Sequence, residues 1–297
     1  MVASPEVIAQ VIRSYREAAT ANRLTAARRG NLIVLSPDLA DDVMITADLH
    51  GQRLNFNKLC RIADLAAHPR RHLVMQEVCH GGPRYPTGWG CMSHLMLEDV
   101  ARLKSEFPER FHFLLSNHEL AELSDHPIAK AGRLLNLQFR AGLQEMYGLE
   151  WPQIRAAFVE FLATCPLAVR LTNGVFVCHG SPTAVDRKGF DTSVLQRPLT
   201  TADYRAGSSV FQLVWGRDFR PENAVAFAKL VEAQVLVHGH EPCSHGSRAP
   251  NGQQIILDCT GPNACYLIVP VGEQLTHTQL LQRVQRLYPK PAGNGAG

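Results

Sequence analysis

The chain alternates between short apolar runs and longer stretches in which apolar residues recur every three or four positions. Runs of four or five apolar, often β-branched residues are typical of buried strands, whereas the periodic stretches are typical of amphipathic helices. Strands are predicted at 32–35, 43–46, 72–75, 111–115, 168–171, 175–178, 235–237, 255–257 and 266–269. Helices are predicted at 5–27, 54–67, 94–106 and through much of 132–163.

The order of these elements differs between the two halves of the chain. In the first half strands alternate with helices, which indicates βαβ units. After residue 164 the strands follow one another with few helices between them, which favours an antiparallel second half. We therefore expect an α/β fold with α+β character. Residues 1–30 should form an N-terminal helix packed on one domain at 31–289, and 290–297 should be a disordered tail.

Composition restricts the class of protein. The 297 residues are 45% hydrophobic and 19% charged, and the formal net charge is only +3, which excludes wholesale disorder and a nucleic-acid footprint. No apolar stretch approaches the roughly 20 residues of a membrane span. The eight cysteines form no CxxC pair, which favours a reducing compartment without disulfides. We expect a soluble, cytoplasmic protein that binds neither nucleic acid nor membrane.

Five predicted strands end in residues of the types that bind metals. In an open α/β sheet, ligands bind just beyond the carboxyl ends of the strands. One Asp or His at such a place is usually a helix cap or a hydrogen-bonded structural residue. Five in order are hard to explain in that way. The residues are Asp48 and His50 after 43–46, Glu77 after 72–75, Asn117 after 111–115, His179 after 175–178, and His240 after 235–237.

The donor types suit a pair of divalent ions. Two such ions about 3.5–4 Å apart need one carboxylate to bridge them, with further carboxylates and neutral imidazoles at the outer positions. Two carboxylates, three imidazoles and one amide supply six ligands here. With a bridging hydroxide, the centre keeps a small positive charge, which suits a phosphate ester.

The same motifs resemble those of a known family. Asp48-Leu-His50-Gly, Ser-Asn117-His118-Glu, Cys-His179-Gly and Gly-His240 occur in the order found in the phosphoprotein phosphatases, a group of the calcineurin-like metallophosphoesterases. The resemblance runs from about residue 43 to residue 271, and Trp215-Gly-Arg217 resembles the Trp-x-Arg of the bacterial branch. It implies two packed β-sheets flanked by helices.

The resemblance also implies a role for each residue. Asp48, His50 and Glu77 would bind the first metal, and Glu77, Asn117, His179 and His240 the second. A bridging hydroxide would attack phosphorus, and His118 would protonate the leaving oxygen. Arg217 and Asn117 would contact the phosphate, and Glu119 would support the loop. Mn²⁺ is the expected ion, with Fe or Zn as alternatives.

The second motif departs from the family pattern. Its Gly-Asp is replaced by Gln76-Glu77, and its Asp-Arg-Gly by His80-Gly-Gly. The change removes the carboxylate that would orient His118 and an arginine that would grip phosphate. The following insert, 83–91, carries Arg84, which either replaces that arginine or is a surface residue. We expect His238 to be structural.

Three functions remain open on these residues. The leading hypothesis is a serine/threonine phosphatase-like phosphomonoesterase acting on a phosphorylated protein. A second is a hydrolase of dinucleoside polyphosphates or other small phosphoesters. The third is a pseudo-phosphatase that binds a partner without turnover, which the altered second motif suggests. The sequence does not determine the oligomeric state.

Overall fold

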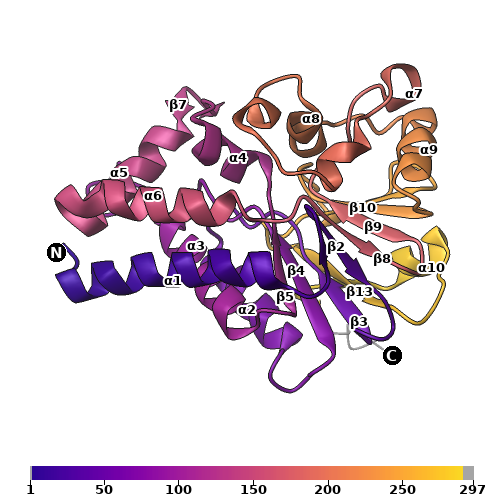
Figure 1. Cartoon of the computed structure of the whole chain (residues 1–297), viewed down its shortest axis with the longest axis horizontal. Helices are drawn as coiled ribbons and strands as arrows, with labels where there is room; N and C mark the ends of the chain where they lie inside the picture. The colour runs from indigo at the N-terminus through magenta and orange to yellow at the C-terminus, as the bar shows by residue number, and fades with distance from the viewer. Residues whose placement is uncertain (1, 290–297) are drawn as a thin grey trace, which may run out of the picture.

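The structure is a computed structural model that describes residues 2–289 (Figure 1). Its α-helices are α1 (Pro5–Leu24), α2 (Arg53–Ala63), α3 (Ser93–Glu106), α4 (Asn117–Ser124), α5 (Leu135–Tyr147), α6 (Trp151–Leu162), α7 (Val185–Lys188), α8 (Ser209–Trp215), α9 (Pro221–Leu230) and α10 (His277–Gln282). Its strands are β1 (Arg28–Arg29), β2 (Leu32–Leu35), β3 (Asp42–Ile45), β4 (Arg71–Gln76), β5 (Phe111–Leu114), β6 (Ala129–Lys130), β7 (Arg133–Leu134), β8 (Ala168–Leu171), β9 (Val175–Cys178), β10 (Val235–His238), β11 (Ser247–Arg248), β12 (Gln254–Leu257), β13 (Cys265–Pro270) and β14 (Val284–Arg286). The tail predicted at 290–297 lies outside the described residues.

Two sheets form the centre of the molecule, with helices around them, as predicted (Figure 1). The five-stranded sheet has the order β14-β13-β3-β4-β5, and β3, β4 and β5 are parallel neighbours. Their side chains are almost all buried, as expected of parallel strands that are covered on both faces. Ile45 pairs with Val74, and Gln76 pairs with Leu114. This register brings the residues that follow each strand to one edge of the sheet.

The second sheet corrects the prediction of an antiparallel second half. Its order is β1-β2-β8-β9-β10-β12-β11, and β10 is parallel to both of its neighbours, β9 and β12. Parallel neighbours need a crossover connection, and α8 and α9 lie in the one between β9 and β10. Both are short, so their helical period is weak in the sequence. Only the β8–β9 hairpin and the edge pairs β1–β2 and β11–β12 are antiparallel in this sheet.

The N-terminal helix α1 packs on α3 and α6 (Figure 1). Ser4 caps it and Pro5 occupies its first turn, and Val11 and Tyr15 are buried beneath it. The helix ends three residues earlier than predicted, at the C-cap Thr25, whose hydroxyl contacts the carbonyls of Ala21 and Pro108 and accepts from Lys104 Nζ. Among residues 2–289, no helix combines the length and apolar character needed to cross a membrane.

Candidate active site

The ends of strands from both sheets meet at one hollow of about 680 Å³. Of the eight residues predicted for the site, seven line this hollow: Asp48, His50, Glu77, Asn117, His118, Arg217 and His240. The eighth, His179, is fully buried directly behind them. The structure therefore brings together all the side chains that the motifs predict.

Glu77 lies at the centre of two groups of possible metal ligands. One group is His50, Glu77 and His118, and the other is Glu77, His179 and His240. Glu77 Oε1 lies 2.9 Å from His50 Nε2, and Glu77 Oε2 lies 2.8 Å from His179 Nε2. One carboxylate therefore faces both groups, as a bridging ligand must.

Asn117 and Asp48 adjoin these groups. Asn117 Oδ1 lies 2.7 Å from His179 Nε2. Asp48 belongs to neither of the two tightest groups; its Oδ1 accepts a hydrogen bond from the backbone N–H of His240 and lies 3.9 Å from His179 Nδ1.

Hydrogen bonds behind the imidazoles determine which ring nitrogen each presents to the site. His50 Nδ1 donates to the carbonyl of Cys79 at 3.2 Å. Gln76 donates to the carbonyl of Thr46 through Nε2, so its Oε1 faces His179 Nδ1 at 2.8 Å and accepts from it. Both imidazoles therefore present Nε2 to Glu77. In the sequence, Gln76 appears only as the residue that replaces the glycine of the family motif, although it directly precedes the ligand Glu77 at a strand end.

The backbone around the site is strained. Outside glycine, nine of the described residues have positive φ, and four of them are His50 (42°), Glu77 (48°), His80 (64°) and His240 (66°). Each such residue costs about 1–3 kcal/mol, and such strain collects where function requires a particular geometry. Gly51 and Gly82 allow the two loops to touch, because a Cβ on Gly82 would lie 2.4 Å from the carbonyl oxygen of Gly51.

The charges in the site influence one another strongly. Burial, together with the adjacent Glu77, raises the pKa of Asp48 to about 7. Burial alone would raise the pKa of Glu77 too, but the imidazoles of His179, His118 and His50 outweigh it and lower that pKa well below its ordinary value. Burial opposes protonation of His50, yet Glu77 raises the pKa of its imidazole to about 10. Bound cations would therefore displace protons from this site.

The residues fit a pair of metal ions. His179 uses Nδ1 as a donor, so a neutral His179 turns a lone pair toward Glu77 Oε2 and Asn117 Oδ1, which are themselves acceptors. Glu77 Oε2 is buried and receives no well-aligned hydrogen bond. A positive charge is needed among these atoms, either a proton on His179 or a metal ion. Neutral imidazole nitrogens with carboxylate and amide oxygens suit divalent transition metals.

The altered second motif has a consequence that the sequence did not predict. His80 Nδ1 lies 2.8 Å from His118 Nδ1. His80 therefore occupies the place that the aspartate of the family motif would take. His80 Nε2 in turn lies 2.9 Å from Glu122 Oε1. The aspartate of the family motif is absent here, and Glu122 instead lies behind His80 in the same series of contacts. The i,i+4 spacing of His118 and Glu122 on α4 was the available signal.

The two arginines differ in position. Arg217 lines the hollow, where its Nη2 donates to the carbonyl of His240 and its Nε pairs with Glu241. Arg84 is exposed and does not line the hollow. Its loop, 83–91, is fastened elsewhere, since Tyr85 OH lies 2.8 Å from His94 Nε2. Of the two readings of Arg84, the structure favours a surface residue.

Two other predicted supporting residues are hydrogen-bonded inside the protein. Glu119 accepts from the backbone N–H groups of Val78 and Cys79, which supports the loop after β4. His238 is fully buried, 3.3 Å from the carbonyl of Cys178 and 3.2 Å from the amide of Gln254. Both arrangements agree with structural roles.

Comparison with known proteins decides the family. The family model for calcineurin-like phosphoesterases matches residues 42–244. The chain belongs to this family. Membership of this family agrees with the metal-dependent phosphoester hydrolysis that the motifs predict.

Sequence identity to individual phosphatases is low. Serine/threonine-protein phosphatase T of Trypanosoma brucei brucei is 21% identical over 252 residues, which cover 79% of this chain and 48% of that protein. The chain thus spans about half the length of this curated relative.

Two solved structures share the fold. A protein serine/threonine phosphatase from Saccharomyces cerevisiae, described as similar to human phosphatase PP5, matches with a TM-score of 0.73 at 15% identity, over 97% of this chain and 91% of that one. A cold-active protein-tyrosine phosphatase of a psychrophilic Shewanella matches with a TM-score of 0.51 at 13% identity, over 82% and 78%.

In this phosphoesterase, one wall of the hollow is apolar. Ile128, Leu135 and Trp215 line it beside Lys130, and the short β6–β7 hairpin carries the lysine. The sequence gives no sign of this wall, because strands of two residues have no recognisable pattern. The wall offers a substrate an apolar surface next to a cation.

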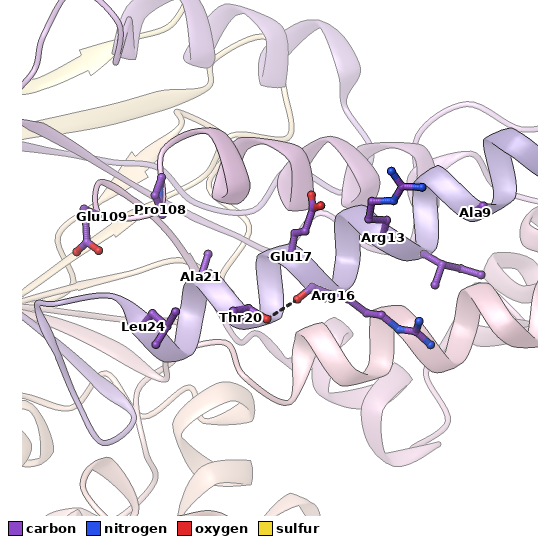
Figure 2. Close-up of a pocket in the computed structure, with 10 residues that line it drawn as sticks. Ala9, Arg13, Arg16, Glu17, Thr20, Ala21, Leu24, Pro108 and Glu109 are labelled. Atoms are coloured by element: carbon purple, nitrogen blue, oxygen red, sulfur yellow. Dashed lines mark hydrogen bonds between the residues drawn. The ribbon is translucent and has the colours of Figure 1, made fainter.

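A second hollow, of about 820 Å³, lies along α1 (Figure 2). Arg13, Arg16 and Glu17 of α1 line it, together with Pro108 and Glu109 from the turn before β5. It holds none of the predicted ligands, so the catalytic chemistry belongs to the hollow at the strand ends.

Proposed function

We propose that the chain is a phosphomonoesterase that removes phosphate from phosphoserine and phosphothreonine in proteins. The observation that carries this proposal is the position of Glu77, whose two oxygens face His50 and His179 at 2.9 and 2.8 Å. A carboxylate shared by two sets of nitrogen ligands is what a dinuclear centre requires. The proposed metal ligands are Asp48, His50, Glu77, Asn117, His179 and His240.

Each residue of the site has a part in this proposal. When bound, the two ions supply positive charge to the phosphoryl oxygens and acidify the attacking water. Asn117 and the guanidinium of Arg217 hold the phosphate, and Arg217 keeps N–H donors free beyond those used for His240 and Glu241. His118 donates the proton that the leaving oxygen needs.

We propose Mn²⁺ as the ion in both positions, with Fe or Zn as alternatives. Imidazole nitrogens and carboxylate and amide oxygens, without a thiolate among the proposed ligands, support an ion of intermediate hardness. The choice of a protein substrate is supported by the name of the curated relative and by the apolar wall with Lys130, which can receive the residues around a phosphorylated side chain. The eight cysteines are free thiols, which supports a cytoplasmic location.

The test compares wild type with Glu77→Gln after loading with Mn²⁺. Wild type should bind two ions per chain and hydrolyse p-nitrophenyl phosphate and a phosphoserine peptide. Glu77→Gln should lose at least one ion, measured by elemental analysis, and nearly all turnover. Glu160→Gln, which changes a carboxylate on α6 paired with Arg23 at the surface, is the matched control and should behave as wild type.

Other outcomes would replace the proposal. Turnover of a dinucleoside polyphosphate alone would make the chain a nucleotide hydrolase. Two bound ions without turnover of any substrate would make it a binding module. Equal activity in Glu77→Gln and wild type would show that Glu77 is an ordinary loop residue.

A further inference from the structure

A chain of three side chains runs from the hollow into the protein. His118 lines the hollow, and its Nδ1 lies 2.8 Å from His80 Nδ1. His80 Nε2 lies 2.9 Å from Glu122 Oε1, and the side chains of His80 and Glu122 are both completely buried. A buried carboxylate is costly unless it is paired and hydrogen-bonded, so its placement behind His80 calls for a physical reason.

The contacts around Glu122 determine the direction of each hydrogen bond. Glu122 Oε1 also accepts from Asn136 Nδ2 at 2.8 Å, and Glu122 Oε2 lies 3.5 Å from Arg140 Nε. A carboxylate can only accept, so His80 Nε2 carries a hydrogen and donates it. Neutral His80 is then an acceptor at Nδ1, and His118 Nδ1 must donate to it. His118 is left with Nε2 as the nitrogen available to the hollow.

The rings in this chain are also held in place. The backbone N–H of His80 donates to Ser93 Oγ at 3.0 Å, which anchors a residue in the left-handed region of φ. The ring of Phe139 packs edge-on against the ring of His80, with centroids 5.5 Å apart. His80 therefore has little freedom to turn away from His118.

We propose that Glu122, acting through His80, is a positioning residue that fixes the ring orientation and tautomer of His118. This inference rests on the proposed function and deepens it, because His118 is the proposed acid. In its acid form His118 carries a hydrogen on both ring nitrogens, and when the phosphoester bond breaks, the His118 Nε2–H bond breaks and an O–H bond forms on the leaving oxygen. The electron pair stays on Nε2, and Nδ1 keeps its hydrogen and its bond to His80. No proton needs to pass through His80.

Leaving-group dependence tests this positioning role in the Mn²⁺-loaded enzyme. An alkyl phosphate needs a proton donor for its leaving oxygen, whereas p-nitrophenyl phosphate needs little help. Glu122→Gln should lower kcat/KM about 10–100-fold for the alkyl substrate and much less for the aryl one. Glu98→Gln is the matched control, because Glu98 pairs with His94 in the interior and does not contact His118. Equal losses on both substrates in Glu122→Gln would overturn the proposal.

A double-mutant cycle tests whether His80 is the link. His80→Asn keeps an acceptor oxygen near the position of His80 Nδ1 but is too short to reach Glu122. In the His80→Asn background, Glu122→Gln should therefore have almost no further effect on the alkyl substrate. Independent, multiplying losses would show that Glu122 acts by another route and would overturn the proposal.

Nitrogen-15 NMR of the histidine rings separates a failure of this inference from a failure of the proposed function. In wild type loaded with diamagnetic Zn²⁺, at a pH at which His118 is neutral, His118 should be a single tautomer with its hydrogen on Nδ1. In Glu122→Gln it should become a mixture, since a glutamine amide can either accept from His80 or donate to it. This readout needs no turnover. A wild-type His118 with its hydrogen on Nε2, or an unchanged His118 in Glu122→Gln, would overturn the positioning role.

Discussion

Two buried histidine–glutamate pairs contact the ring of Phe139 and make an instructive comparison. His80 Nε2 lies 2.9 Å from Glu122, and His94 Nδ1 lies 3.1 Å from Glu98. Both imidazoles meet the ring of Phe139 edge-on, with centroids 5.5 and 6.3 Å away. In kind of interaction and depth of burial the two pairs are nearly the same.

They differ in what the second nitrogen of each imidazole contacts. His80 Nδ1 contacts His118 at the hollow. His94 Nε2 contacts the hydroxyl of Tyr85, while Tyr147 donates to Glu98. The first pair therefore acts on a functional side chain, and the second fastens loop 83–91 to α3. A buried histidine–glutamate pair is thus not a sign of function by itself; the partner of the remaining histidine nitrogen decides its role.

The largest expected effect comes from replacing His118, the residue that the His80–Glu122 pair contacts. His118→Asn should reduce kcat/KM for an alkyl phosphate by about 10²–10⁴-fold, because the leaving alkoxide loses its proton donor. The loss on p-nitrophenyl phosphate should be much smaller. Steady-state kinetics on the two substrates, with bound metal measured for each preparation, provide the check.

Equal losses on both substrates would leave His118 only as a support for its neighbour Asn117. Loss of metal in the variant would instead point to His118 as a metal ligand, since it belongs to one of the two ligand groups around Glu77.

Replacing Arg217 and Arg84 in turn tests whether loop 83–91, which His94 holds through Tyr85, lies away from the hollow. Arg217→Ala should weaken the binding of inorganic phosphate by about 2–4 kcal/mol without loss of metal, because a charged donor leaves the hollow. Arg84→Ala should leave phosphate affinity unchanged, since its loop is fastened away from the hollow. Competitive inhibition by phosphate measures both. A weaker affinity in Arg84→Ala would mean that loop 83–91 folds over the site.

The metal ligands that the sequence predicted share one property: each lies within a few residues of the end of an apolar strand. Strand ends meet at the edge of a sheet whatever the order of the strands, so Asp48, Glu77 and His179 converge even though the pairing of β10 was mispredicted. Parallel pairing of β10 depended on α8 and α9, whose short lengths hide their period.

Glu122 and Gln76 were missed for a different reason. Glu122 contacts His80 across 42 positions, and the direction of the loop after β4 depends on positive φ at His80, Gly81 and Gly82. No periodic pattern encodes such a turn. Gln76 occupies a position where the family motif has glycine, so a motif comparison counts it as a loss, although its amide orients His179.

The second pair can be broken on its own. Glu98→Gln should lower the free energy of unfolding by about 1–3 kcal/mol, because His94 and Tyr147 lose a charged partner inside the protein. The ratio of alkyl to aryl turnover should stay at the wild-type value. Urea denaturation and the two-substrate assay measure these quantities. If the ratio moved as expected for Glu122→Gln, the contrast between the pairs would be wrong.

A third histidine pair, without a carboxylate, shows what the two glutamates supply. His72 Nδ1 lies 2.9 Å from His112 Nε2, and His72 Nε2 lies 3.3 Å from the carbonyl of Leu39. With no anion beside it, burial lowers the pKa of His72 to about 4. In the unfolded chain the pKa of His72 is about 6.5. Between pH 4 and pH 6.5, His72 therefore binds a proton in the unfolded chain but not in the folded protein. The contribution of neutral His72 to the free energy of unfolding should therefore be fully present above pH 6.5 and be lost as the pH is lowered toward 4.

The slope of this fall gives the measurement. His72 should contribute up to about 1.4 kcal/mol per pH unit to the loss of unfolding free energy between pH 6.5 and 4. His72→Gln keeps an N–H donor for the carbonyl of Leu39 but has no proton to gain, so its stability should fall less steeply over this window. His68→Gln, at an exposed position, controls for the substitution itself. Urea denaturation of the metal-free proteins at several pH values provides the slopes, with metal release excluded. Identical slopes for wild type and His72→Gln would mean that this imidazole takes up its proton without unfolding, and that a buried pair needs no carboxylate to carry charge.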